Sequence, residues 1–94
     1  MKKDVNDISF SDFQPKRFAL SYDPPTIVLE YLVPSTGKLY HHKMRLRNLT
    51  KESKIDEMMV YLEQRHPLYF MNPILKKAQI RNLVERLQFR MKGS

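Results

Sequence analysis

The clearest pattern in the chain is an alternation of apolar and polar residues in two neighbouring stretches. Residues 26–33 are rich in β-branched and aromatic side chains and contain one charge, Glu30, which is typical of a strand. Because both faces of this strand are apolar, we expect it to be covered on both sides, or covered on one with a sticky second face. Residues 38–47 alternate more strictly and predict a half-buried strand with Tyr40, His42, Met44 and Leu46 on one face and His41, Lys43, Arg45 and Arg47 on the other. With a turn at residues 34–37, these stretches predict an antiparallel hairpin over residues 26–47.

The second half of the chain has the spacing of helices. A helix is expected from about residue 54 to 66, with Thr50 or Ser53 as its N-cap and Pro67 at its end. Its buried stripe is Ile55, Met58, Met59 and Leu62. Residues 68–71 are too apolar for a solvated loop, so we expect them to fill the core between helices. The last helix begins at Asn72–Pro73 or after a break near residues 78–79, and its buried stripe is Ile80, Leu83, Val84, Leu87 and Met91.

The N-terminal part of the chain is less regular. Residues 17–22 predict a short extended segment, closed by Pro24 and Pro25, which cannot donate ladder hydrogen bonds. Residues 1–15 are expected to form a flexible tail, or a strap whose Ile8, Phe10 and Phe13 pack on the domain. The alternative is a short linear motif that docks on a partner through Phe10 and Phe13. Residues 16–94 are expected to form a single α+β domain, an antiparallel β-hairpin or three-stranded sheet followed by two or three packed helices.

Composition excludes several classes of protein. The chain has 94 residues, no cysteine and two glycines. Disulfide frameworks, thiolate zinc sites, cysteine nucleophiles and glycine-rich phosphate loops are therefore excluded. The N-terminus lacks the apolar segment of a signal peptide, and residues 26–33 are too short to span a bilayer. We expect a cytoplasmic protein that inserts into no membrane.

The residues suited to catalysis are few. His41 and His42 are neighbours in a predicted strand, so they point to opposite faces and cannot bind one metal together. His66 stands at a predicted helix end, where histidines commonly interact with the helix C-terminus. The sequence contains no histidine–carboxylate set with metal spacing and no nucleophile elbow. We expect neither an enzyme nor a cofactor, and no small-molecule substrate.

The net charge of +7 favours an acidic partner. The excess lies after residue 25, in the part predicted to fold. We expect partner binding by the basic side chains of the second hairpin strand and the last helix, namely Lys43, Arg45, Arg47, Arg81, Arg86 and Arg90, although a solvated surface cation is the commoner role of any one of them. A basic strand face beside tyrosines also suits nucleic acid. A nucleic-acid-binding module is therefore the alternative function, disfavoured because no RNP, KH or helix-turn-helix pattern occurs.

The order of these motifs resembles one known family. An Arg17–Phe18 segment precedes the paired prolines, an aliphatic strand reaches Tyr31, and a basic strand leads into Arg47–Asn48. A helix then ends at His66–Pro67, and a last helix runs from Ile80-Arg81-Asn82-Leu83 to Met91-Lys92-Gly93. This succession, over roughly residues 16–93, is similar to the conserved N-terminal globular part of the family of the centrosomal protein of 19 kDa (CEP19-like).

The resemblance implies a non-enzymatic scaffold or adaptor at the centriole and ciliary base. Members of the family are recruited by the centriolar protein FOP and a large centrosomal scaffold, and they capture a Rab-like GTPase in its GTP form for intraflagellar transport. They also extend past the position of Ser94 into a long acid-rich tail, so the resemblance is compatible with a chain that is a fragment. If that tail holds the GTPase, the present chain carries the centriolar anchoring alone.

Overall fold

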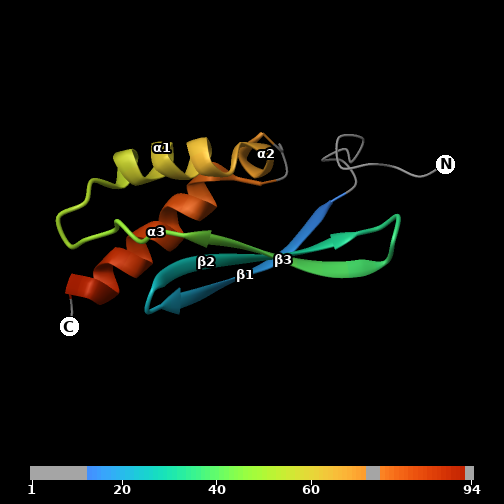
Figure 1. Ribbon diagram of the computed structural model, residues 1–94, viewed down its shortest axis with the longest axis horizontal. Coiled ribbons are helices and arrows are strands. Elements are labelled where there is room, and N and C mark those ends of the chain that lie inside the picture. The colour runs from blue at the N-terminus through green and yellow to red at the C-terminus, as the bar shows by residue number, and fades with distance from the viewer. Residues whose placement is uncertain (1–12, 72–74, 93–94) are drawn as a thin grey trace.

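The folded part of the chain is a sheet followed by helices. The computed structural model describes residues 13–71 and 75–92. Within them, strands β1 (Gln14–Tyr22), β2 (Pro25–Val33) and β3 (Lys38–Arg45) precede helices α1 (Ile55–Arg65), α2 (Pro67–Phe70) and α3 (Lys77–Lys92) (Figure 1). The predicted α+β class is confirmed, in its three-stranded, three-helix form.

The three strands form an antiparallel sheet in the order β1-β2-β3. The predicted hairpin joins β2 and β3, and β3 ends at Arg45, two residues earlier than expected. Its turn closes through the carbonyl of Val33, which accepts hydrogen bonds from the backbone N–H groups of Thr36 and Gly37. Gly37 has a φ of 69°, in the left-handed region that glycine enters without a steric penalty.

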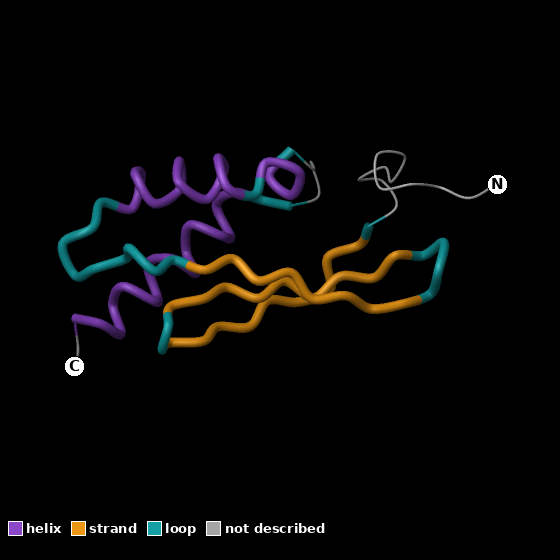
Figure 2. The backbone as a smooth tube through the Cα atoms, viewed as in Figure 1, coloured by secondary structure: helices purple, strands orange, loops and turns teal. Residues whose placement is uncertain are grey.

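The three helices cover one face of the sheet (Figures 1 and 2). Helix α3 contacts β1 and β2, and α1 packs against α3 and α2. On this inner face, Ile27 and Leu29 are completely buried, whereas Val28 and Leu32 of the outer face remain half-buried. Strand β2 is therefore covered on one side only, the second of the two arrangements that its apolar faces allowed.

A bulge in β1 determines which residues of the N-terminal part are buried. Pro15 pairs with Tyr31 and Arg17 with Glu30, so Lys16 is an extra residue in the ladder. Because one inserted residue reverses the alternation of faces, Phe13 and Phe18 both point to the inner face although they are five positions apart. Phe13 is 3% exposed, so it packs on the domain as the strap alternative expects. The expected packing of Ile8 and Phe10 lies outside the described residues.

The predicted helices and their buried stripes are largely confirmed. The buried apolar residues of α1 and α3 are Met58, Leu62, Ile80, Leu83, Val84 and Leu87, while Ile55, Met59 and Met91 pack against them in partly buried positions. The predicted N-caps are wrong, because Lys54 occupies that position without a side-chain cap. Ser53 instead accepts a hydrogen bond from the backbone N–H of Thr50.

The loop between β3 and α1 is held by a side chain of α3. The amide nitrogen of Gln88, which is buried, donates to the backbone oxygens of Thr50, Lys51 and Ser53 at 3.1, 3.3 and 2.6 Å. The Thr50 oxygen also accepts a hydrogen bond from the backbone N–H of Ser53. Sequence spacing had placed only apolar side chains on this face of α3.

Residues 68–71 fill the core only in part. Phe70 is buried and Tyr69 half-buried, but Leu68 and Met71 are 55% and 74% exposed. The reason is that Pro67 begins the one-turn helix α2. The helical turn directs Tyr69 and Phe70 toward the core and leaves Leu68 and Met71 in solvent. Of the two predicted starts of the last helix, Asn72–Pro73 lies outside the described residues, and α3 begins at Lys77, close to the alternative at residues 78–79.

Candidate docking surfaces

The outer face of the sheet carries the basic strand residues predicted to bind a partner. Lys43 and Arg45 are exposed there and pair in register with Val28 and Thr26 of β2. Arg47 is also exposed, but it lies beyond the end of β3, so the predicted row of three strand cations is reduced to two. Within the described part of the chain, none of the three forms an ion pair.

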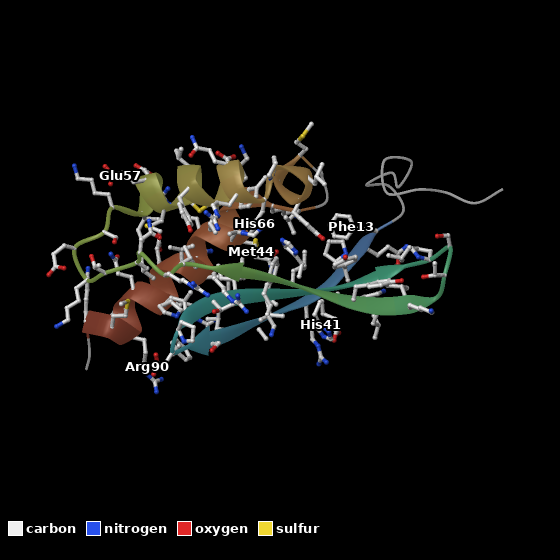
Figure 3. The ribbon with its side chains drawn as sticks, viewed as in Figure 1. Phe13, His41, Met44, Glu57, His66 and Arg90 are labelled. Carbon is white, nitrogen blue, oxygen red and sulfur yellow. The ribbon has the colours of Figure 1, made fainter. Side chains whose placement is uncertain are left out.

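The middle of the outer face is electrically balanced. Glu30 accepts a hydrogen bond from Arg17 Nε at 3.0 Å, and its other oxygen lies 3.0 Å from His41 Nε2. The hydrogen bond from Arg17, and then that from His41, lowers the pKa of the Glu30 carboxyl. The predicted opposite faces of His41 and His42 are confirmed: His41 points away from the helices (Figure 3), whereas His42 contacts His66 on the inner face. Among the described residues of this face, Lys43 and Arg45 are therefore the β3 cations without an acidic partner.

The three predicted arginines of the last helix have different roles. Arg81 bonds to Asp56 of α1, and its Nε lies 3.4 Å from Glu85. These contacts tie α1 to α3 and raise the pKa of the Arg81 guanidinium, chiefly through the bond to Asp56. Arg86 and Arg90 are exposed and form no ion pair with a described residue. Arg81 is thus part of the helix packing, whereas the other two remain available for a partner.

Arg86 and Arg90 line an open groove, which we call the α3 groove. It has a volume of about 590 Å³ and is lined by Tyr22, Asn82, Glu85, Arg86, Phe89 and Arg90. The guanidinium carbon of Arg90 lies 4.8 Å from the centre of the Tyr22 ring, a cation–π contact between α3 and the end of β1. Phe89 is 76% exposed. Neither aromatic residue had been predicted as a site; the available signal was the position of Phe89 off the apolar stripe.

Phe13 does not belong to a docking surface. Its ring packs edge-on against Tyr31 at 4.9 Å and against Tyr69 at 5.6 Å, inside the layer between sheet and helices (Figure 3). The prediction that Phe13 docks on a partner is therefore wrong, because this side chain is already part of the core. The second residue of that pair, Phe10, lies outside the described residues.

The rings around Phe13 form an aromatic cluster of Phe13, Tyr31, Tyr40, His42, His66 and Tyr69. His42 stacks on Tyr69 with ring centres 3.9 Å apart, and its Nε2 lies 2.8 Å from Nδ1 of His66. One of these nitrogens must donate and the other accept, so the contact holds with both rings neutral. Sequence reasoning missed it, because it had assigned His66 to its own helix end. The β3 register places His42 on the inner face, but the partner comes from 24 residues away.

Burial keeps the histidines of the aromatic cluster uncharged. It lowers the pKa of His42 to about 4, and the nearby His66 adds to the effect. Burial, and then the charge of Arg65, likewise lowers the pKa of His66. Burial and the hydrogen bond with Tyr31 raise the pKa of the Tyr69 hydroxyl. The cluster is therefore an uncharged set of contacts that joins β3 to the α1–α2 junction.

Catalytic machinery is not evident in the described residues. Residues 13–71 and 75–92 contain no group of three or more histidines and carboxylates placed to hold a metal ion. Within these residues, the side chains of His42 and His66 hydrogen-bond to each other.

The fold is a small α+β domain whose outer sheet face and α3 groove carry exposed basic side chains. A family model described as CEP19-like protein matches residues 16–93, and the chain belongs to this family of generally non-enzymatic centrosomal and ciliary proteins. No curated protein and no solved structure matches the chain. Among the described helices, none has the length and apolarity needed to cross a membrane.

Proposed function

We propose that this domain is an adaptor at the centriole and ciliary base. It docks onto a centriolar scaffold protein of the FOP type and helps to recruit a GTP-bound Rab-like GTPase for ciliogenesis and intraflagellar transport. The observation that carries the proposal is the family match over residues 16–93, which includes every described helix and nearly all of the sheet.

The outer face of the sheet supports docking of an acidic scaffold segment. Lys43 and Arg45 are exposed cations on β3, and in the order β1-β2-β3 this strand has a neighbour on one side only. A strand edge with unpaired backbone groups accepts an extended peptide as an additional strand, while side chains beside it select the partner. Basic side chains on such an edge favour an acidic segment and speed its association.

The test is recovery of the scaffold and of the GTPase on the immobilised chain. The Lys43→Glu/Arg45→Glu variant reverses both outer-face charges and is expected to lose most of the scaffold. Lys51→Glu/Lys54→Glu, with the same total charge change in the loop before α1, serves as the matched control and should retain it. Equal losses in both variants would mean that net charge alone drives recovery, and would overturn the assignment to the outer face.

Nucleotide dependence tests the second half of the proposal. The GTPase loaded with a non-hydrolysable GTP analogue should be recovered in preference to the GDP form, because switch regions are ordered by the γ-phosphate. Equal recovery of the two forms would rule out an effector role. A labelled oligonucleotide titrated at two salt concentrations checks the alternative, since nucleic-acid binding would weaken steeply with salt.

A further inference from the structure

The α3 groove combines an exposed apolar side chain with arginines that have no carboxylate partner among the described residues. Phe89 follows Gln88 on α3; Gln88 is buried, whereas Phe89, about 100° further around the helix, is 76% exposed. The inner side of the helix already supplies the core through Ile80, Val84 and Leu87. Phe89 therefore contributes little to folding, yet it lies beside a second aromatic ring, Tyr22, in the same open groove.

The two arginines of the groove, Arg86 and Arg90, are placed where they can bind an anion. The Arg90 guanidinium lies over the Tyr22 ring, and a planar guanidinium can form the paired hydrogen bonds that match a carboxylate. Arg86 lies one turn earlier on α3 and lines the same groove. Glu85, the acidic residue of the lining, is engaged by Arg81. The charge that the groove presents to a ligand is therefore positive.

We infer that the α3 groove binds an acidic peptide segment that carries one apolar anchor residue. The anchor packs between Phe89 and Tyr22, and carboxylates of the segment pair with Arg86 and Arg90. This inference rests on the proposed function, since it gives a protein-docking domain a second contact, distinct from the outer face of the sheet. Aromatic and arginine residues in one concave patch are the usual composition of an interface hot spot.

Charge and size favour a peptide over the other anionic partners. The groove offers two arginines and holds a carboxylate, Glu85, in its lining, whereas nucleic-acid binding rests on several phosphate contacts along a continuous basic track. An anionic membrane surface would require a broad apolar face, but Phe89 is the one large apolar side chain of α3 that is mostly exposed within the described residues. A short acidic segment with one apolar residue fits both the chemistry and the extent of the groove.

Selection of peptides on the whole chain tests this inference without any assumed partner. A displayed library of random 12-residue peptides is selected on the unmodified chain, and the affinities of the recovered peptides are measured by fluorescence polarisation. We expect enrichment of Asp and Glu with one Leu, Ile, Phe or Met. Phe89→Ala and Arg86→Glu/Arg90→Glu should each weaken these peptides about tenfold or more, whereas Lys43→Glu/Arg45→Glu should leave their affinities unchanged.

The selection and the scaffold assay fail independently. Recovery of basic peptides, of none, or of peptides insensitive to Phe89→Ala and Arg86→Glu/Arg90→Glu would overturn the groove inference, even if the scaffold is still captured. Acidic peptides that bind the groove while the scaffold is not captured would contradict the proposed function alone. Circular dichroism melts of each variant show whether the fold is retained, which we expect because Phe89 and Arg90 are exposed.

Discussion

Aromatic side chains gather at two places in this domain, and the two groups differ in whether they have partners. In the aromatic cluster, every ring has another ring of the cluster as a neighbour, and the polar atoms of Tyr31, Tyr69, His42 and His66 bond to one another. In the α3 groove, Tyr22 holds Arg90 but Phe89 faces solvent. The first group is complete within the chain, whereas the second lacks a partner for its apolar side chain and its cations.

This difference separates stability from binding. A closed set of rings contributes its full burial to folding, so a change there weakens the native state. An exposed ring contributes almost nothing to folding until another surface covers it. The same residue type, phenylalanine, therefore has a structural role at position 13 and a binding role at position 89.

The sharpest way to test the comparison is to truncate one phenylalanine in each group. Phe13→Ala is expected to lower the free energy of unfolding by about 3 kcal/mol, because it removes a buried ring and leaves a cavity between Tyr31 and Tyr69. Phe89→Ala should change it by less than about 0.5 kcal/mol, since its ring is exposed. Urea unfolding of both variants measures the contrast. Similar losses at the two positions would mean that Phe89 is part of the core.

The fate of Phe13 shows where sequence reasoning was sufficient and where it was not. The hairpin, α1 and α3 followed from local alternation and helical spacing, which depend only on residues close in the chain. The place of Phe13 depends on the bulge at Lys16 and on Tyr69, far along the chain. A bulge has no reliable signature in one sequence, so the sequence could not decide between a packed strap and a docking tail, and the docking role of Phe13 was wrong.

The candidate sites were predictable to a similar extent. Strand alternation placed Lys43 and Arg45 away from the core, and helical spacing did the same for Arg86 and Arg90; all four are exposed. These patterns could not show that Arg81 is engaged by Asp56, nor that Tyr22 meets Arg90, because these pairs join separate elements. The pairing of His42 with His66 was hidden for the same reason. Tertiary contacts, and not residue types, decide which charged and aromatic groups remain available.

The histidines of the aromatic cluster make stability depend on pH. The pKa of His42 is lowered from 6.5 to about 4 on folding, so the unfolded state binds more protons between these values. The free energy of unfolding should therefore be constant above about pH 7 and fall as the pH drops through that window. We expect a loss of about 1–2 kcal/mol by pH 4.5, after allowance for solvent screening at a half-buried site. Arg65 and His66 disfavour the added charge, and neutral Tyr69 offers no counter-charge.

Urea unfolding between pH 7.5 and 5 isolates this contribution, because the lowered pKa of Glu30 takes effect only below its usual value of 4.5. His42→Gln/His66→Gln should flatten the dependence over that range. His41→Gln, on the outer face, is the matched control and should keep it. An unchanged slope in the double variant would show that other groups set the pH response.

A smaller effect is expected from the hydroxyl pair inside the aromatic cluster. The hydroxyl oxygens of Tyr31 and Tyr69 lie 3.3 Å apart. Tyr31→Phe keeps the ring contacts and removes this hydrogen bond, so the free energy of unfolding should fall by about 1 kcal/mol. Tyr40→Phe is the control, because the Tyr40 ring stacks on Tyr31 but its hydroxyl makes no hydrogen bond with a described residue. Equal losses would assign the effect to the rings and not to the hydroxyls.

The smallest effect on stability, and the most informative one for the α3 groove, is expected from Arg90→Lys. Lysine keeps the positive charge but loses the planar fork that stacks on Tyr22. A cation–π contact at an exposed site is worth about 0.5–1 kcal/mol, and lysine can keep most of it, so the free energy of unfolding should change by only a few tenths of a kcal/mol. The affinity for acidic, apolar-anchored peptides should nevertheless fall several-fold, because the carboxylate loses an oriented pair of donors. Arg65→Lys, whose guanidinium lies 5.5 Å from the Tyr61 ring on α1 and away from the groove lining, is the matched control. If both substitutions lower peptide affinity equally, the loss does not depend on the α3 groove, and the assignment of the site is wrong. If only Arg90→Lys lowers it, Tyr22 and Arg90 act together as a preformed carboxylate site.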